Sequence, residues 1–203
     1  MSLSKEKIIE VALARFSRYG FNKTTMNEIA EDLKITKGNL YYYYADKVKL
    51  ITDVFMHIAE EVMSGQKRII NSYDGDFMGT LFELLEDRTQ IIKKYYILHL
   101  SENMEWIKGL DLDATIQSLR EREVSQFKSF FELAQQRADV QFKKVDDAAF
   151  MYVELMKGIA LSENISNIIN CFPDSIKMDE ILERQKLATQ FIFENKIIHK
   201  SDH

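Results

Sequence analysis

The scarcity of turn-forming residues is the feature that most limits how this chain can fold. Its 203 residues include one Pro and seven Gly, below the usual shares of roughly 5% and 7%. A β-sandwich or barrel needs a turn every ~8–12 residues, and this chain is too poor in turn formers to supply them. Apolar residues recur instead at steps of three and four, as at Ile8, Ala12 and Phe16, which is typical of amphipathic helices. The sequence therefore predicts an all-α protein.

Local start and stop signals predict where the helices lie. Asp46 is an N-cap candidate for a long helix, Gly20 is placed to cap the first helix in a left-handed conformation, and Pro173 is expected to end a later helix. The predicted helices cover residues 5–19, 26–33 and 37–44, a long segment from 47 onwards, and residues 77–100, 113–137, 146–170 and 178–198, with an irregular stretch at 106–111.

Composition indicates a compact protein with a buried core. The chain has 46% hydrophobic and 29% charged residues, which is not the composition of a disordered protein. A single cysteine, Cys171, excludes an internal disulfide framework and fits a reducing compartment. No apolar run approaches the ~18 residues of a membrane-spanning helix, and no signal peptide precedes the first helical pattern. We expect a cytoplasmic protein without a membrane partner.

Charge is distributed unevenly along the chain. The net charge is −5, but residues 1–50 hold nine Lys and Arg against six Asp and Glu, a net charge of +3. The remaining 153 residues hold 18 basic and 26 acidic side chains, a net charge of −8. A basic N-terminal segment on an acidic body is the asymmetry expected when one end of a protein meets phosphate groups.

The first 45 residues predict three short helices, with a tight turn between the second and the third. Thr25 and Glu28 have the spacing of a capping box at the start of the second helix, and Thr36 is a good N-cap for the third. Three helices in this arrangement are the components of a helix-turn-helix.

The third helix has the residues of a DNA recognition helix. Leu40 and Tyr44 share one face and are expected to be buried, which leaves the polar and remaining aromatic side chains outward. Lys can bind guanine acceptors, Asn can pair with adenine, and Tyr hydroxyls can donate to phosphate. Gly38 allows the backbone to approach the groove closely, and Lys47 lies beside a helix N-terminus that can accept a phosphate. The outward residues are Lys37, Asn39, Tyr41, Tyr42 and Tyr43.

Aromatic residues at helical spacing are more often core than interface, which is the simplest alternative interpretation of this segment. Four consecutive tyrosines, however, cannot all face one core, because successive residues turn by ~100° around a helix axis. At least two of them are therefore expected to be exposed.

Residues 8–50 resemble the N-terminal domain of TetR-type bacterial transcriptional regulators. The matching residues are Phe16, Gly20, Thr24, Thr25, Ile29, Ala30, Leu33, the run from Thr36 to Tyr44, Asp46, Lys47 and Leu50. The resemblance implies phosphate contacts from Thr25, from Tyr41 or Tyr42, and from Lys47. It implies base contacts from Lys37, Asn39 and Tyr43, with Asn27 and Thr36 as supporting polar contacts. Two residues depart from the family pattern: Asn27 stands where a basic residue is common, and Lys34 occupies a turn position usually held by Gly, where a positive φ is expected.

The same resemblance predicts two domains: a three-helix helix-turn-helix domain for binding DNA at residues 1–46, and a larger helical domain for ligand binding and dimerisation at residues 47–203. Most aromatic residues of the second domain are expected to be core. The residues predicted to line a ligand pocket are Phe82, Tyr95, His99, Glu102, Trp106, Phe127, Phe131 and Tyr152.

The last two helices are predicted to form the interface of a homodimer, since two such helices from each subunit can form a four-helix bundle. Alternatively, their apolar stripes simply close the chain's own core. The stripes are Met151, Leu155, Ile159, Ile165, Ile168 and Ile169 on one helix and Ile181, Leu182, Ala188, Phe191 and Ile192 on the other.

The sequence favours a transcription regulator, predicted to be a repressor that binds palindromic DNA and is released by an unknown small molecule. The alternative is a helical ligand-binding or scaffold protein without operator-specific DNA binding, which the departures at Asn27 and Lys34 leave open. No phosphate-binding loop, nucleophile elbow or zinc-protease motif is present, so no enzyme activity, cofactor or metal is expected. His199 and His203 have a metal-binding spacing but lie in the last five residues, where we expect a frayed tail.

Overall fold

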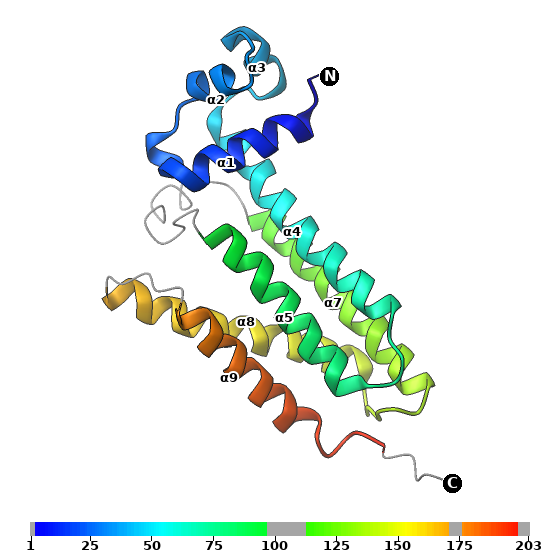
Figure 1. Ribbon diagram of the computed structural model, residues 1–203. Coiled ribbons are helices and arrows are strands. Elements are labelled where there is room, and N and C mark those ends of the chain that lie inside the picture. The colour runs from blue at the N-terminus through cyan, green and yellow to red at the C-terminus, as the bar shows by residue number, and fades with distance from the viewer. Residues whose placement is uncertain (1–2, 97–112, 171–175, 199–203) are drawn as a thin grey trace. The chain divides into compact units, whose positions relative to one another are not determined.

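The computed structural model describes residues 3–96, 113–170 and 176–198. Within these ranges the chain forms eight α-helices (Figure 1). They are α1 (Lys5–Lys23), α2 (Met26–Asp32), α3 (Lys37–Tyr43), α4 (Lys47–Asn71), α5 (Phe77–Tyr96), α7 (Asp113–Gln136), α8 (Val145–Asn170) and α9 (Ile176–Phe193). The all-α prediction is confirmed, and most helix starts fall within two residues of their predicted positions. Cys171, Pro173, His199, His203 and the stretch 106–111 lie outside the described residues.

The chain divides into two compact units. Unit 1 comprises residues 1–61 and 93–114, and unit 2 comprises residues 62–92 and 115–203. The boundary predicted at residue 46 does not coincide with the division between these units, and it stays a prediction. No helix of the described ranges is both long and apolar enough to cross a membrane.

The core of unit 1 is formed by the apolar stripe that the sequence predicts on α1. Ile8, Ala12 and Phe16 are fully buried, and the Phe16 ring lies 4.9 Å from the ring of Phe21. Gly20 has the expected positive φ of 78°, but the helix does not end there. It kinks at Gly20 and continues to Lys23, and the kink brings Phe21 into the core beside Phe16.

The core of unit 2 is an aromatic cluster contributed by α5, α7, α8 and α9. The ring of Phe77 stacks on that of Phe130 at 5.4 Å, and the ring of Phe131 stacks on that of Phe142 at 4.9 Å. Phe193, at the end of α9, contacts this cluster edge-on. An isolated antiparallel bridge pairs Val140 with Ile197 and so holds the segment after α9 against the loop before α8. Rings packed from four helices fix the relative positions of those helices within the unit.

Candidate nucleic-acid interface

The start of α2 is fixed by the predicted capping box. The Thr25 hydroxyl accepts a hydrogen bond from the Glu28 amide at 3.3 Å, and the Glu28 carboxylate accepts one from the Thr25 amide at 2.7 Å. These bonds and the Arg15 guanidinium, at 2.9 Å, hold the pKa of Glu28 below its ordinary value. Arg15 also binds Asp32 at 2.7 Å. Helix α2 is therefore capped locally and tied at both ends to α1.

The turn between α2 and α3 depends on a strained residue. Lys34 has a φ of 55°, as its position in the resemblance predicts. The Lys34 amide donates to the Glu31 carbonyl at 2.9 Å, and the Ile35 amide donates to the Ala30 carbonyl at 3.0 Å. Thr36 then caps α3 by accepting from the Asn39 amide at 3.2 Å. A left-handed conformation is unfavourable for Lys, so the surrounding bonds must maintain it.

Helix α3 is anchored through one face and exposed on the other. Leu40 and Tyr44 are completely buried, as predicted. Burial, with Asp53 nearby, raises the pKa of the Tyr44 phenol. Tyr41 and Tyr42 are 40% and 85% exposed, which confirms that at least two of the four tyrosines face outward.

The polar residues predicted to contact DNA are also exposed. They include Lys37 and Asn39, and the Lys37 ammonium lies 5.6 Å from the centre of the Tyr41 ring. A Cβ atom added to Gly38 would meet nothing within 4 Å, so the first turn of α3 borders open space. Three further predicted residues at the starts of α2 and α3, Thr25, Asn27 and Thr36, are exposed as well.

Two predicted contact residues are bound within unit 1. The Tyr43 hydroxyl donates to the Leu3 carbonyl at 3.2 Å. The Lys47 ammonium donates to the carbonyls of Phe21 and Thr24 at 2.8 and 2.9 Å, and burial lowers its pKa. Sequence reasoning missed these bonds because the acceptors are main-chain carbonyls more than 20 residues away, and any residue type supplies such a carbonyl.

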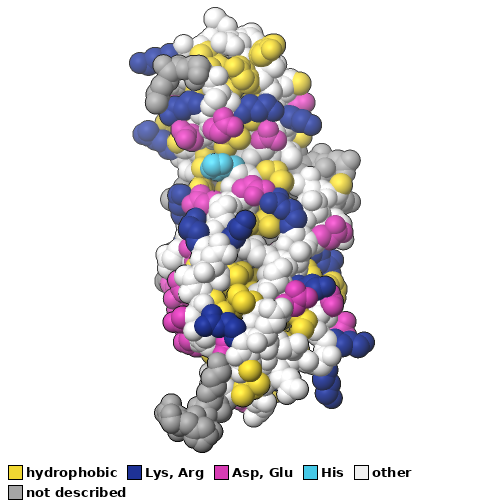
Figure 2. All heavy atoms as spheres, turned by 90° about the vertical axis from the view of Figure 1, so that its right-hand side faces the viewer, with side chains coloured by type: hydrophobic (Ala, Val, Ile, Leu, Met, Phe, Trp, Pro, Cys, Tyr) yellow, Lys and Arg dark blue, Asp and Glu magenta, His cyan; other side chains and the backbone are white. Residues whose placement is uncertain are grey.

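Surface charge is mixed in sign. On the face drawn in Figure 2, Lys and Arg side chains lie among Asp and Glu side chains. Among its described residues, this face therefore presents no single broad basic area.

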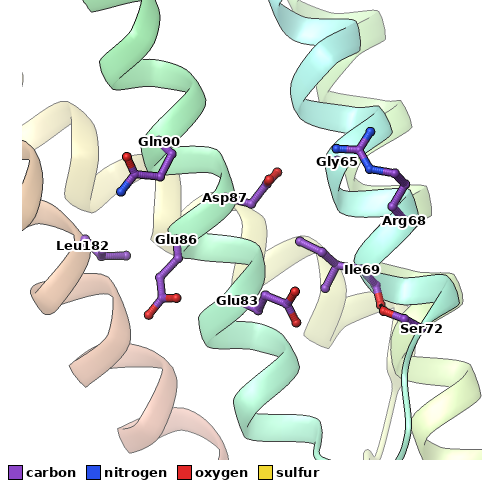
Figure 3. A pocket seen from close by; sticks show the side chains of 9 residues that line it. All are labelled: Gly65, Arg68, Ile69, Ser72, Glu83, Glu86, Asp87, Gln90 and Leu182. Atoms are coloured by element: carbon purple, nitrogen blue, oxygen red, sulfur yellow. Dashed lines mark hydrogen bonds between the residues drawn. The ribbon is translucent and has the colours of Figure 1, made fainter.

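Unit 2 contains a cavity of about 670 Å³ between α4, α5 and α9. In Figure 3, Glu83 and Asp87 point from α5 toward α4, whereas Glu86 and Gln90 lie on the side of Leu182 of α9. The other lining residues are Gly65, Arg68 and Ile69 of α4, and Ser72, which directly follows α4. The Lys186 ammonium binds Glu86 at 2.6 Å. Three carboxylates and one arginine line the cavity, so the cavity is acidic.

The predicted pocket residues do not line this cavity. Phe127, Phe131 and Tyr152 are buried in the aromatic cluster of unit 2. Phe82 is half-buried with the Lys186 ammonium 5.8 Å from its ring centre, and Tyr95, in unit 1, donates its hydroxyl proton to Glu61. His99, Glu102 and Trp106 lie outside the described residues. A pocket at these residues stays a prediction.

Helices α8 and α9 lie side by side (Figure 1) and divide their apolar residues between core and surface. Ile181 and Leu182 are buried, while Leu187 and Phe191 are 69% and 79% exposed. On α8, Met151 and Leu155 are exposed. Ile159, Ala188 and Ile192 pack partly against the core, and the side chains of Ile165, Ile168 and Ile169 lie outside the described set. We refer to Met151, Leu155, Leu187 and Phe191 as the α8–α9 apolar face.

Three helices with a tight turn between the second and the third, and a third helix exposed on one face, define a helix-turn-helix protein. Residues 8–54 match the sequence profile of the family described as bacterial regulatory proteins, tetR family. The match covers residues 8–54 of the 203 residues, and over this segment the chain is similar to the TetR family.

Two proteins with similar sequences are also regulators of operons by description. A probable acrEF/envCD operon repressor of Escherichia coli K12 is 32% identical over 53 residues, which are 26% of this chain and 24% of that protein. The chain thus matches only about a quarter of that relative's length. The biofilm operon icaADBC negative transcriptional regulator IcaR of Staphylococcus aureus is 27% identical over 144 residues, 68% of this chain and 76% of that protein. One relative is described as a probable repressor and the other as a negative transcriptional regulator.

Solved structures share the fold along nearly the whole chain. A transcriptional regulator from Cytophaga hutchinsonii superposes with a TM-score of 0.82 at 23% identity, covering 95% of this chain and 98% of its own. A TetR-family regulator from Mesorhizobium loti superposes with a TM-score of 0.66 at 16% identity, covering 93% and 96%. At these identities the similarity is one of fold.

Proposed function

We propose that this protein is a transcription repressor that binds a palindromic DNA operator as a homodimer and is released by a small molecule. The observation that carries the proposal is the two-sided character of α3. Leu40 and Tyr44 fix the helix in the core, while Lys37, Asn39 and Tyr42 remain exposed. The naming of both curated relatives as a repressor or a negative regulator supports repression in particular.

We assign the exposed residues two kinds of contact. Lys37 and Asn39 contact base edges, because their side chains match the acceptors of guanine and the donor–acceptor pair of adenine. Tyr41, Tyr42 and Thr25 contact phosphates through their hydroxyls. Gly38 permits close approach of the backbone, and Asn27 and Thr36 provide supporting polar contacts.

The homodimer is proposed to form through the α8–α9 apolar face. Side chains such as Leu187 and Phe191 have no polar group that could bond with water, so a second copy that covers them removes apolar surface from the solvent. A twofold dimer presents two recognition helices, and a palindromic operator has the matching symmetry.

Release is proposed to result from a ligand that binds unit 2, with the acidic cavity as the candidate site. Helix α4 begins at Lys47, a few residues after α3, and its residues Gly65, Arg68 and Ile69 line the cavity. A ligand that changes the position of α4 would therefore act on the helix that follows the recognition helix. To release the operator it must bind one conformation several kcal/mol more tightly than the other.

Binding of the purified protein to its own upstream DNA and to a random duplex, measured by fluorescence anisotropy at two salt concentrations, tests the proposal. We expect a preference of roughly a thousandfold and a strong decrease in affinity with salt. Because the operator can lie elsewhere, a selection from genomic fragments accompanies the measurement. Equal, weak binding to every duplex would favour the alternative of a helical ligand-binding or scaffold protein.

A further inference from the structure

The first residues of the chain are tied to the C-terminal end of the recognition helix. Tyr43 is the last residue of α3, and its hydroxyl donates to the Leu3 carbonyl. Leu3 directly precedes Ser4, which caps α1 by accepting from the Lys7 amide at 3.3 Å. The donor and the acceptor are 40 residues apart in sequence, so their bond is a tertiary contact.

A second contact connects the same two elements. The Lys5 ammonium lies 5.3 Å from the centre of the Tyr44 ring and 3.9 Å from the Asp53 carboxylate of α4. The start of α1 is thus joined to the end of α3 through two consecutive tyrosines. The ring of Tyr43 also packs edge-on against that of Tyr42, with the ring centres 5.5 Å apart. Tyr43 therefore connects the N-terminal backbone with the most exposed tyrosine of the recognition helix.

We propose that Tyr43 is a positioning residue for operator binding, which holds α3 and Tyr42 in place through the Leu3 carbonyl and does not itself contact DNA. This inference rests on the proposed function. A phenol has one proton to donate. While that proton is given to Leu3, the hydroxyl can only accept, and a phosphate offers no donor at pH 7. Tyr43 also differs from its neighbours in exposure, because its side chain is half-buried while those of Tyr41 and Tyr42 are exposed.

The first test is Tyr43→Phe in the full chain, with Tyr42→Phe as the matched control. A hydrogen bond of this kind changes the equilibrium between positioned and unpositioned helix by a small factor. We therefore expect Tyr43→Phe to lower operator affinity about threefold to tenfold. Affinity for operators changed at any one base pair should fall by the same factor. A change of preference at one base pair would overturn the proposal, and so would unchanged affinity.

The second test removes the acceptor rather than the donor. A chain that begins at Ser4, released from a cleavable fusion, lacks the Leu3 carbonyl but keeps the Ser4 cap. In this background Tyr43→Phe should have no further effect, whereas Tyr42→Phe should still lower affinity. Acetylation of the Ser4 amine replaces the lost carbonyl, so the difference between Tyr43 and Phe at this position should return. An equal effect of Tyr43→Phe in all three backgrounds would show that Tyr43 acts on DNA directly.

Hydrogen exchange without DNA separates this inference from the proposed function. The Tyr44 amide donates to the Leu40 carbonyl at 3.0 Å, at the end of α3 and next to the residue that bonds with Leu3. We expect Tyr43→Phe to accelerate exchange of this amide about threefold or more, with an unchanged thermal midpoint. If the wild-type protein binds no operator but Tyr43→Phe accelerates exchange, the proposed function fails, whereas the role of the Tyr43–Leu3 hydrogen bond in holding α3 is supported. If the protein binds its operator but neither exchange nor affinity changes, the positioning role fails alone.

Discussion

Large apolar or aromatic side chains are exposed both on α3 and on the α8–α9 apolar face, and the chemistry of these two surfaces differs. On α3, Tyr41 and Tyr42 each carry a hydroxyl and have Lys37 and Asn39 as polar neighbours. On the α8–α9 apolar face, the exposed Leu187 and Phe191 can form no hydrogen bond through their side chains. A surface with hydroxyls suits a hydrated, charged partner, and a surface without them suits a dry interface. Exposure alone therefore does not identify a partner, whereas the polar groups beside the exposed rings do.

The largest expected effect comes from placing a charge on the dry surface. Phe191→Glu would bury a carboxylate in the proposed dimer interface, and we expect a loss of at least about 4 kcal/mol of association free energy. Sedimentation velocity at micromolar concentration should show monomers, and operator affinity should fall at least a hundredfold. Ile116→Glu, at a similarly exposed apolar residue of α7, is the control and should leave the dimer intact. A dimeric Phe191→Glu variant would place the interface elsewhere.

The next effect concerns the ion cluster that joins α8 to the rest of unit 2. Glu123 of α7 is buried and binds the Arg88 guanidinium of α5 and, at 2.7 Å, the Lys157 ammonium of α8. Removing the shared carboxylate leaves both cations without their partner, and we expect Glu123→Gln to lower the free energy of unfolding by about 3 kcal/mol. Urea denaturation measures this, with Glu121→Gln as an exposed control on the same helix.

The Glu123 cluster also predicts a pH dependence. Burial opposes ionisation of Glu123, but the two cations outweigh it and hold its pKa below the ordinary 4.5. Near and below that pH the unfolded state therefore binds more protons than the folded state, and the stabilisation decreases as the pH falls through the folded pKa. The difference in stability between wild type and Glu123→Gln should be constant above about pH 5.5 and shrink below pH 4.5. A difference that stays constant down to pH 3 would show that the carboxylate charge contributes nothing.

On the hydrated surface, substitutions should separate base reading from phosphate binding. Lys37→Ala and Asn39→Ala should each cost about 1–3 kcal/mol on the preferred operator and relax the preference at one base pair. Tyr42→Phe should weaken all duplexes alike, because phosphates carry no sequence information. Competition binding with single-base operator variants measures both effects. Equal losses on operator and random DNA for Lys37→Ala and Asn39→Ala would contradict this division.

The smallest effect lies in the turn that presents α3. Lys34 has a φ of 55°, which Gly adopts without strain, so Lys34→Gly should raise the free energy of unfolding by about 0.5 kcal/mol. Lys34→Ala keeps the backbone strain and serves as the control for loss of the charge. A destabilised Lys34→Gly variant, measured by urea denaturation, would show that the side chain has a stabilising contact stronger than the strain.

The helix-turn-helix could be predicted from the sequence because its determinants are local. The Thr25–Glu28 box, the Thr36 cap and the burial of Leu40 and Tyr44 each depend on residues three or four positions apart. The positive φ of Lys34 is predicted by the resemblance, because Gly usually occupies this turn position in the family.

Contacts between distant segments could not be predicted. The stripe on α9 was expected to face a partner as a whole, but Ile181 and Leu182 face the core while Phe191 faces outward. Helical spacing shows which residues share a side, and tertiary packing decides where that side points. The acceptors of Tyr43 and Lys47 are backbone carbonyls, which have no signature in the sequence.

Selection of bound sequences from a random duplex library tests whether the protein is a dimeric operator-binding regulator, because it works even when the operator sequence is unknown. We expect an enriched motif with twofold symmetry whose half-sites are about one helical turn or more apart, bound by two protomers. Lys37→Ala should then change the enriched bases at symmetric positions in both half-sites. Enrichment of no motif, or of a single asymmetric site bound by one protomer, would contradict a dimeric operator-binding regulator.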